Sequence, residues 1–180
     1  ELPALVLRRA DAARRSLGWA RRHTGLLVVG HGTPRAAASA AHARHLAAAL
    51  ADCGLAEIAF ALLEEPPMPG CAARAMSASS IVAVGLFIDN GPHGDVDVRA
   101  ALAGTARPLA YTGAIGTDSG LVPLILHLVA AGSPGEAAMG AEHGAGHGDE
   151  RQGGKDRVRT LHEGHGPVRI ASCPAVEPVV

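Results

Sequence analysis

The sequence predicts an α/β fold: a small flavodoxin-like parallel sheet of about four strands flanked by helices, followed by a flexible C-terminal tail. Short apolar runs alternate with Ala- and Leu-rich segments over residues 24–132, and this periodicity disappears in the remainder of the chain. Alternating strands and helices with short connections are typical of right-handed crossovers and a parallel sheet. We expect strand order 2-1-3-4, in one domain plus trailing sequence for a chain of 180 residues.

The segment that precedes the predicted lobe, residues 1–23, is rich in Arg and Ala. Its apolar anchors are Leu5, Leu7, Leu17 and Trp19. We expect a helix whose arginines face water. We interpret it as the end of a preceding region, such as an upstream lobe of a longer protein, or as an added N-terminal helix.

Four apolar runs predict the strands. The first, at 26–29, is short, continuous and stopped by Gly-His-Gly, which suits a strand buried on both faces. The clearest run is the third, and in chain order the four runs are 26–29, 57–63, 81–88 and 108–112. Together they predict the sheet of the lobe.

Four further segments predict the helices, at 36–50, 68–78, 97–103 and 118–131. Good helix formers dominate the first of them. Thr117 stands where an N-cap of the last helix is expected. His127 lies in that helix among apolar residues, so we expect it to be partly buried.

The C-terminal segment, residues 133–180, is dominated by Gly, Glu, His and Arg. It cannot bury enough apolar surface to offset its ordering entropy, so we expect it to be mostly disordered. Its histidines make it either a low-affinity metal reservoir or a flexible solubilising tail: His143, His147, His162 and His165.

Composition and motifs exclude several classes of protein. The 16 basic and 17 acidic residues argue against a nucleic-acid binder. No apolar run approaches the roughly 20 residues that span a bilayer, and no secretory leader is recognised, so we expect a cytoplasmic protein without a membrane partner. Phosphate-loop, dinucleotide-binding, nucleophile-elbow and CxxC motifs are missing from the sequence.

Three potential metal ligands lie at the carboxyl ends of predicted strands. His31 follows the first strand, Glu64 ends the second, and His93 lies in the loop after the third. In the expected order these strands are neighbours about 4.8 Å apart, so the three side chains can converge on one cation. Two imidazoles and a carboxylate suit Co²⁺, Fe²⁺, Ni²⁺ or Zn²⁺. The alternatives are solvated histidines and a polar turn at Glu64.

Glycines surround these candidate ligands, among them Gly32 and Gly91. A glycine lets the backbone approach a bulky, flat partner without a clash at Cβ. Two more histidines, His42 and His45, fall in the helix predicted at 36–50, and we interpret them as surface residues.

The chain resembles a known family in four ordered motifs: LLVVGHGTPRAAAS at 26–39, FALLEEPP at 60–67, VAVGLFIDNGPHGDVDVRAAL at 82–102 and YTGAIGTDSGLVPLIL at 111–126. They are similar to the strands, ligand loops and final helix start of the class II tetrapyrrole chelatases. The match is to the sirohydrochlorin cobalt or iron chelatases of cobalamin and siroheme synthesis. Four motifs in order are much more specific than any one of them.

The resemblance implies that His31 and His93 bind the metal, with Glu64 as their acidic partner. It implies a lyase that inserts a divalent metal, first Co²⁺ and otherwise Fe²⁺ or Ni²⁺, into sirohydrochlorin or a related tetrapyrrole. The metal is then a substrate. An iron–sulfur cluster is not expected, because Cys173 is the one cysteine in the C-terminal segment.

Substrate contacts are expected at the first loop, where Thr33, Arg35 and Ser39 add hydrogen bonds or charge beside Gly32, and at Gly91. Arg35 is equally well explained as a surface residue. Because members of the family work with two lobes, the resemblance implies a homodimer or the second lobe of a longer chain. Two alternatives stay open: a non-enzymatic metal-binding or delivery module, and a structural lobe that completes another lobe's cleft.

Overall fold

A computed structural model describes residues 1–33 and 38–132 of the chain. The disorder expected for 133–180 therefore lies outside the described residues. The main elements are α1 (Leu2–Ser16), β1 (Thr24–Gly30), α2 (Ala38–Ala49), β2 (Glu57–Leu62), α3 (Pro69–Ala75), β3 (Ser80–Gly85), α4 (Val98–Leu102), β4 (Leu109–Ala114) and α5 (Leu121–Ala130). A π-helical segment, Pro92–Asp97, leads directly into α4.

The four strands form one parallel sheet in the order β2-β1-β3-β4, which confirms the predicted topology. Every residue of β1 is buried, as expected for a central strand covered on both faces. Gly30 at the end of β1 pairs with Leu62 of β2, and Val29 pairs with Gly85 of β3. The carboxyl ends of these three strands therefore lie side by side.

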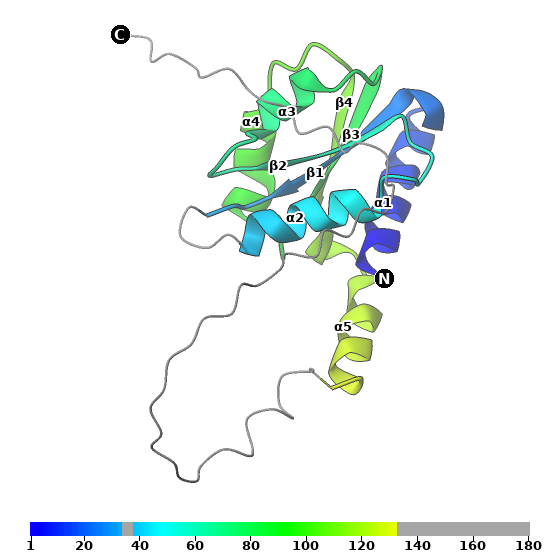
Figure 1. Cartoon of the computed structure of the whole chain (residues 1–180), viewed down its shortest axis with the longest axis vertical. Helices are drawn as coiled ribbons and strands as arrows, with labels where there is room; N and C mark the ends of the chain where they lie inside the picture. The colour runs from blue at the N-terminus through cyan, green and yellow to red at the C-terminus, as the bar shows by residue number, and fades with distance from the viewer. Residues whose placement is uncertain (34–37, 133–180) are drawn as a thin grey trace, which may run out of the picture.

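Alternate side chains of the strands point to opposite faces of the sheet, and each face has its own apolar layer. On one face, Leu26 and Val28 pack with side chains of α1 and α2. On the other face, Leu27 and Val29 pack with side chains of α3 and α4. The result is a three-layer α/β lobe, with the sheet between two pairs of helices (Figure 1).

Helix α1 belongs to this lobe, because Leu5 and Val6 are buried in the layer shared with α2. The expectation that its arginines face water is wrong for Arg9 and Arg14, whose side chains are 16% and 14% exposed. The guanidinium of Arg9 donates to the carbonyl of Thr112 in β4, at 2.7 Å. Packing of α1 across β3 and β4 brings Arg9 against the sheet, whereas Arg14 pairs with Asp11 of its own helix.

Strand β3 ends at Gly85, three residues earlier than the predicted 81–88 run. The amide of Leu86 still donates to the carbonyl of Val29, at 2.7 Å, before the chain leaves the sheet. Leu86, Phe87 and Ile88 then form part of the wall of a pocket described below. The apolar run therefore continues past the strand because its last residues line a pocket.

Helix α5 extends away from the sheet (Figure 1), and none of its residues is buried. Its N-cap is Gly120, and the hydroxyl of Thr117 instead donates to the carbonyl of Ala114, so the predicted cap is wrong. The side chain of His127 is 66% exposed, so the expectation of partial burial is wrong.

Helix α5 also exposes several apolar side chains: Val122, Ile125, Leu126, Leu128 and Val129. Among the described residues, no helix is both long and apolar enough to cross a membrane.

Candidate functional site

His31 stands directly after β1, with a half-exposed side chain. Its Nδ1 lies 2.6 Å from the carbonyl oxygen of Gly32. A carbonyl oxygen only accepts hydrogen bonds, so Nδ1 is the donor in this contact and Nε2 is left for another partner. That Nε2 lies 3.6 Å from Oε1 of Glu64. The ring is thus oriented with Nε2, the nitrogen not bonded to Gly32, beside a carboxylate.

The position of Glu64 follows from strand pairing. The ladder between β1 and β2 continues past the strands, because the amide of Leu63 donates to the carbonyl of Gly30 at 3.1 Å. The amide of Glu64 donates to the carbonyl of His31 at 3.0 Å. The backbones of His31 and Glu64 are therefore hydrogen-bonded at the point where their side chains face each other.

His93 reaches the same place from the loop after β3. Its ring lies edge-on to that of His31, with 4.9 Å between ring centroids and an interplanar angle of 88°. Its Nδ1 lies 2.7 Å from Oδ2 of Asp97, one helical turn later. A carboxylate on one imidazole nitrogen orients the ring and leaves the other nitrogen for a metal. Sequence reasoning missed Asp97, although its spacing of four residues from His93 is the spacing of neighbours on a helix.

The glycines and the first loop have structural roles as well. Gly32 has φ +72°, and a Cβ there would stand 2.9 Å from Cβ of Leu62 and from Cγ of Glu65. The amide of Thr33 donates to Oε1 of Glu65 at 3.0 Å. Glu65 thus holds the loop after β1 against the end of β2. This role was not predicted from the sequence.

The remaining predicted substrate contacts are less constrained. The amide of Gly91 donates to Oδ1 of Asp89 at 2.9 Å, closing a tight turn just before His93. Ser39 lies in the first turn of α2, and Arg35 falls outside the described residues. Binding of substrate by Gly32, Thr33, Arg35, Ser39 and Gly91 stays a prediction.

The hydroxyl of Tyr111 fixes the loop that carries His93, since it donates to the carbonyl of Gly94 at 2.5 Å. Burial, with the nearby Asp95 carboxylate as a smaller cause, raises the pKa of Tyr111 from 10.0 to about 12. A raised pKa means that the folded state favours the neutral phenol. Its contribution to stability is present below pH 10 and is lost as the pH rises toward about 12.

We therefore expect the phenolate of Tyr111 to form only near pH 12 in the folded protein. The chain contains one tyrosine, so near-ultraviolet absorption during a pH titration reports this residue alone. The same titration in denaturant supplies the control, with a midpoint near the ordinary value of about 10. Equal midpoints in the two titrations would contradict the burial of the Tyr111 hydroxyl.

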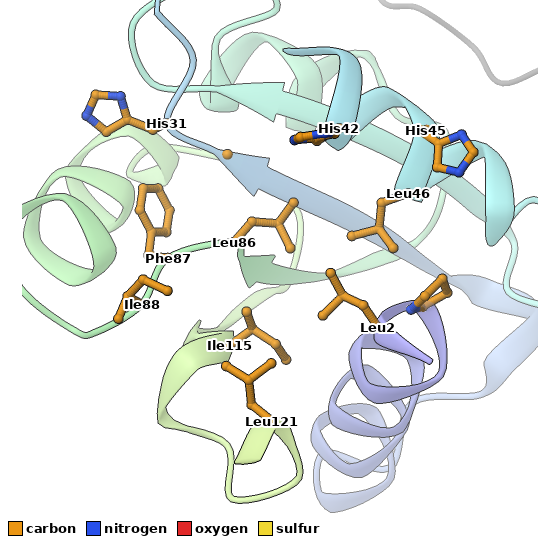
Figure 2. Close-up of a pocket in the computed structure, with 12 residues that line it drawn as sticks. Leu2, His31, His42, His45, Leu46, Leu86, Phe87, Ile88, Ile115 and Leu121 are labelled. Carbon is orange, nitrogen blue, oxygen red and sulfur yellow. The ribbon is translucent and has the colours of Figure 1, made fainter. Parts of the chain in front are cut away.

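A pocket of about 620 Å³ opens beside His31 on the face covered by α1 and α2. Figure 2 shows His31, His42 and His45 along one side, with Ile115 and Leu121 on the opposite side. His42 and His45 are exposed, as predicted, but they line this pocket. Its full lining is Leu2, Pro3, Gly30, His31, His42, His45, Leu46, Leu86, Phe87, Ile88, Ile115 and Leu121.

Comparison with protein families identifies the family of this lobe. The family model described as CbiX matches residues 25–131, which is more than half of the chain. The chain belongs to the CbiX family. This confirms the resemblance to the class II chelatases that the four motifs carry.

Solved structures agree with the CbiX assignment. A structure of CbiX, described as the terminal enzyme for biosynthesis of siroheme in denitrifying bacteria, is 28% identical over 73% of this chain, with a TM-score of 0.64. A multi-domain protein from Deinococcus radiodurans, described as similar to chelatases, shares the fold at 22% identity and a TM-score of 0.53 over 73% of this chain. This chain spans 57% of the first protein and 30% of the second. No curated protein matches it significantly.

The three candidate ligands of this CbiX-family lobe are neighbours without forming a closed cage. His31 contacts both Glu64 and His93. Within residues 1–33 and 38–132, no three His, Cys, Asp or Glu side chains are grouped so as to hold an ion. That these three residues bind the metal stays a prediction.

Proposed function

We propose that this protein is a chelatase that inserts a divalent metal into sirohydrochlorin or a closely related tetrapyrrole. Co²⁺ is the metal proposed first, with Fe²⁺ and Ni²⁺ as alternatives. The observation that carries the proposal is the contact between the rings of His31 and His93, 4.9 Å apart, in a CbiX-family lobe. The siroheme pathway named for the solved CbiX supports a tetrapyrrole substrate.

The histidines suit a metal that is held only briefly. His31 and His93 each use Nδ1 for a hydrogen bond, to a carbonyl and to a carboxylate, and keep Nε2 for the ion. Neutral imidazoles do not cancel the charge of the cation. A bound Co²⁺ therefore still attracts the nitrogens of an incoming macrocycle, and its ligands can be exchanged one at a time.

Glu64 fits the role of proton acceptor. Insertion of M²⁺ replaces two pyrrole N–H protons, and the approaching cation lowers the pKa of those groups. The carboxylate of Glu64 lies 3.6 Å from Nε2 of His31, and its side chain is 46% exposed. A half-exposed carboxylate beside the metal can accept a proton and release it to solvent.

The pocket beside His31 offers a surface for the macrocycle. Leu46, Leu86, Ile115 and Leu121 line it, so its walls are largely aliphatic. A flat tetrapyrrole loses apolar area from water when it lies against such a surface, which favours binding. We place the macrocycle there, against the aliphatic wall and next to His31.

The proposal is tested by incubating the full chain anaerobically with sirohydrochlorin and Co²⁺ and following the tetrapyrrole absorption spectrum. We expect the spectrum of the metal complex to appear faster than without protein. A chain that ends at residue 132 should retain the activity. If removal of 133–180 abolishes Co²⁺ binding and His31→Ala does not, a metal-delivery module replaces the chelatase. If insertion appears only after a second, different lobe is added, this is a structural lobe.

Asp97 gives a further prediction. Asp97→Ala removes the carboxylate that orients His93, so Co²⁺ affinity is expected to fall about 10- to 100-fold. Calorimetric titration with Co²⁺ measures the effect. Asp95→Ala is the matched control, because Asp95 pairs with Arg99 on the same segment and should leave the affinity unchanged. Equal losses in both variants would mean that the segment, and not the orientation of His93, is affected.

We propose that the working unit contains two such lobes, with a second copy covering α5. The chain spans 57% of the CbiX chain it resembles, and α5 exposes a row of apolar side chains. Leu126 and Val129 are 63% and 73% exposed there. Burial of such side chains against a partner is the ordinary reason for their presence on a surface.

We expect a dimer by light scattering after size-exclusion chromatography, and a monomer for Leu126→Glu. Leu17→Glu is the matched control, because Leu17 is also exposed, at 49%, but stands at the end of α1. A wild-type chain that elutes as a monomer would contradict the proposal for a second copy.

A further inference from the structure

Two histidines of α2 face the pocket and have no place in the proposed metal chemistry. His42 and His45 are three residues apart, so they stand next to each other on one side of the helix. Both are exposed, whereas Ala43 and Leu46, on the inner side of α2, are buried. Figure 2 shows them in line with His31 along one side of the pocket.

The pocket has a one-sided polarity. Its polar side chains are the three histidines, and none of the described residues that line it is Asp, Glu, Lys or Arg. The opposite side is aliphatic, with Ile115 and Leu121. A ligand that suits this lining combines an apolar body with hydrogen-bonding groups along one edge.

We propose that His42 and His45 bind peripheral carboxylate groups of a flat macrocycle whose body lies on the aliphatic part of the pocket. This inference rests on the proposed function and adds two specificity-determining residues to it. An imidazole carries at least one N–H donor in either charge state, so each histidine can donate a hydrogen bond to a carboxylate. Side-chain carboxylates held on α2 would set how the ring is turned relative to His31.

A metal pair is the competing interpretation of two histidines at this spacing. The surroundings favour the carboxylate. No acidic side chain among the described lining residues would balance a dication, and an unbalanced charge against an aliphatic wall is costly. An incoming carboxylate can accept from the N–H group of each of these two histidines, and no acidic side chain of the described lining would repel it.

The test compares sirohydrochlorin with its methyl ester, each without metal, in equilibrium binding to the full chain. For His42→Ala/His45→Ala we expect the Kd of the acid to rise about tenfold per histidine removed, and the Kd of the ester to stay at its wild-type value. His42→Gln/His45→Gln should restore part of the affinity, because the amide of glutamine also donates. In turnover with Co²⁺ the alanine variant should raise KM for the acid.

Controls separate this inference from the proposed function. His23→Ala, an exposed histidine at the other end of β1, should change nothing. Equal losses for acid and ester in the alanine variant, or an unchanged Kd for the acid, would overturn the assignment. Weaker binding of Co²⁺ alone, with macrocycle binding intact, would replace it with the metal pair. A wild-type chain that binds neither macrocycle would overturn both this inference and the chelatase proposal.

Discussion

Replacing either His31 or His93 with alanine is expected to lower the rate of metal insertion about 100-fold or more. Each imidazole has Nδ1 already bonded, so Nε2 is its nitrogen for the ion. Loss of one ligand removes several kcal/mol of interaction with a divalent metal. The measurement is the initial rate of the absorption change with sirohydrochlorin and Co²⁺.

His23→Ala supplies the control for these variants, because it removes an exposed imidazole at the amino end of β1, away from the site. Circular dichroism should show the wild-type fold in all three variants, since His31 and His93 are partly exposed and fill no core position. A wild-type rate in either site variant would contradict the assignment of that histidine.

Gly94→Ala is expected to destabilise the lobe by about 1–3 kcal/mol and to lower its activity. A Cβ at this position would collide with the backbone carbonyl of Asp89, which cannot move as a flexible side chain can. The carbonyl of Gly94 also accepts the hydrogen bond from Tyr111. A shift of this loop displaces the neighbouring His93. Urea unfolding and the insertion assay measure the two effects.

Val96→Ala is the matched control for Gly94→Ala. Val96 lies in the same π-helical segment and is 64% exposed, so its truncation removes little packing. We expect wild-type stability and activity from it. If Gly94→Ala behaves in the same way, the loop tolerates movement and does not hold His93 in place.

The sheet and the pairing of His31 with Glu64 could be predicted from the sequence for a simple reason. Residues 26–29 form an apolar run that is stopped by glycine, so the end of β1 can be located from the sequence. Neighbouring parallel strands end at one edge, which places the residues after β1 and β2 together. The structure has this order and this contact.

Side-chain direction limited the rest of the prediction. The contact between Asp97 and His93 could not be predicted, because the sequence did not predict that residues 92–97 are helical. Burial of Arg9 depends on a carbonyl of β4 that is more than one hundred residues away in the chain. The sequence did not show which side of α2 faces the pocket. His42 and His45 lie in a helix made mostly of alanine, so its sides differ little in residue type.

Three separate segments, and not one shared loop, deliver the polar groups of the site: His31 and Glu64 follow β1 and β2, and His93 lies in the helical segment after β3. The backbone at Glu64 is held by its own hydrogen bond to His31, and that bond does not involve the carboxylate. Exchange of one group, for example Glu64→His or Glu64→Cys, therefore leaves the other two anchored by their own segments of the chain. The site is modular in this respect: we expect single exchanges among these proposed ligands to change the preference among metal ions without redesign of the interior.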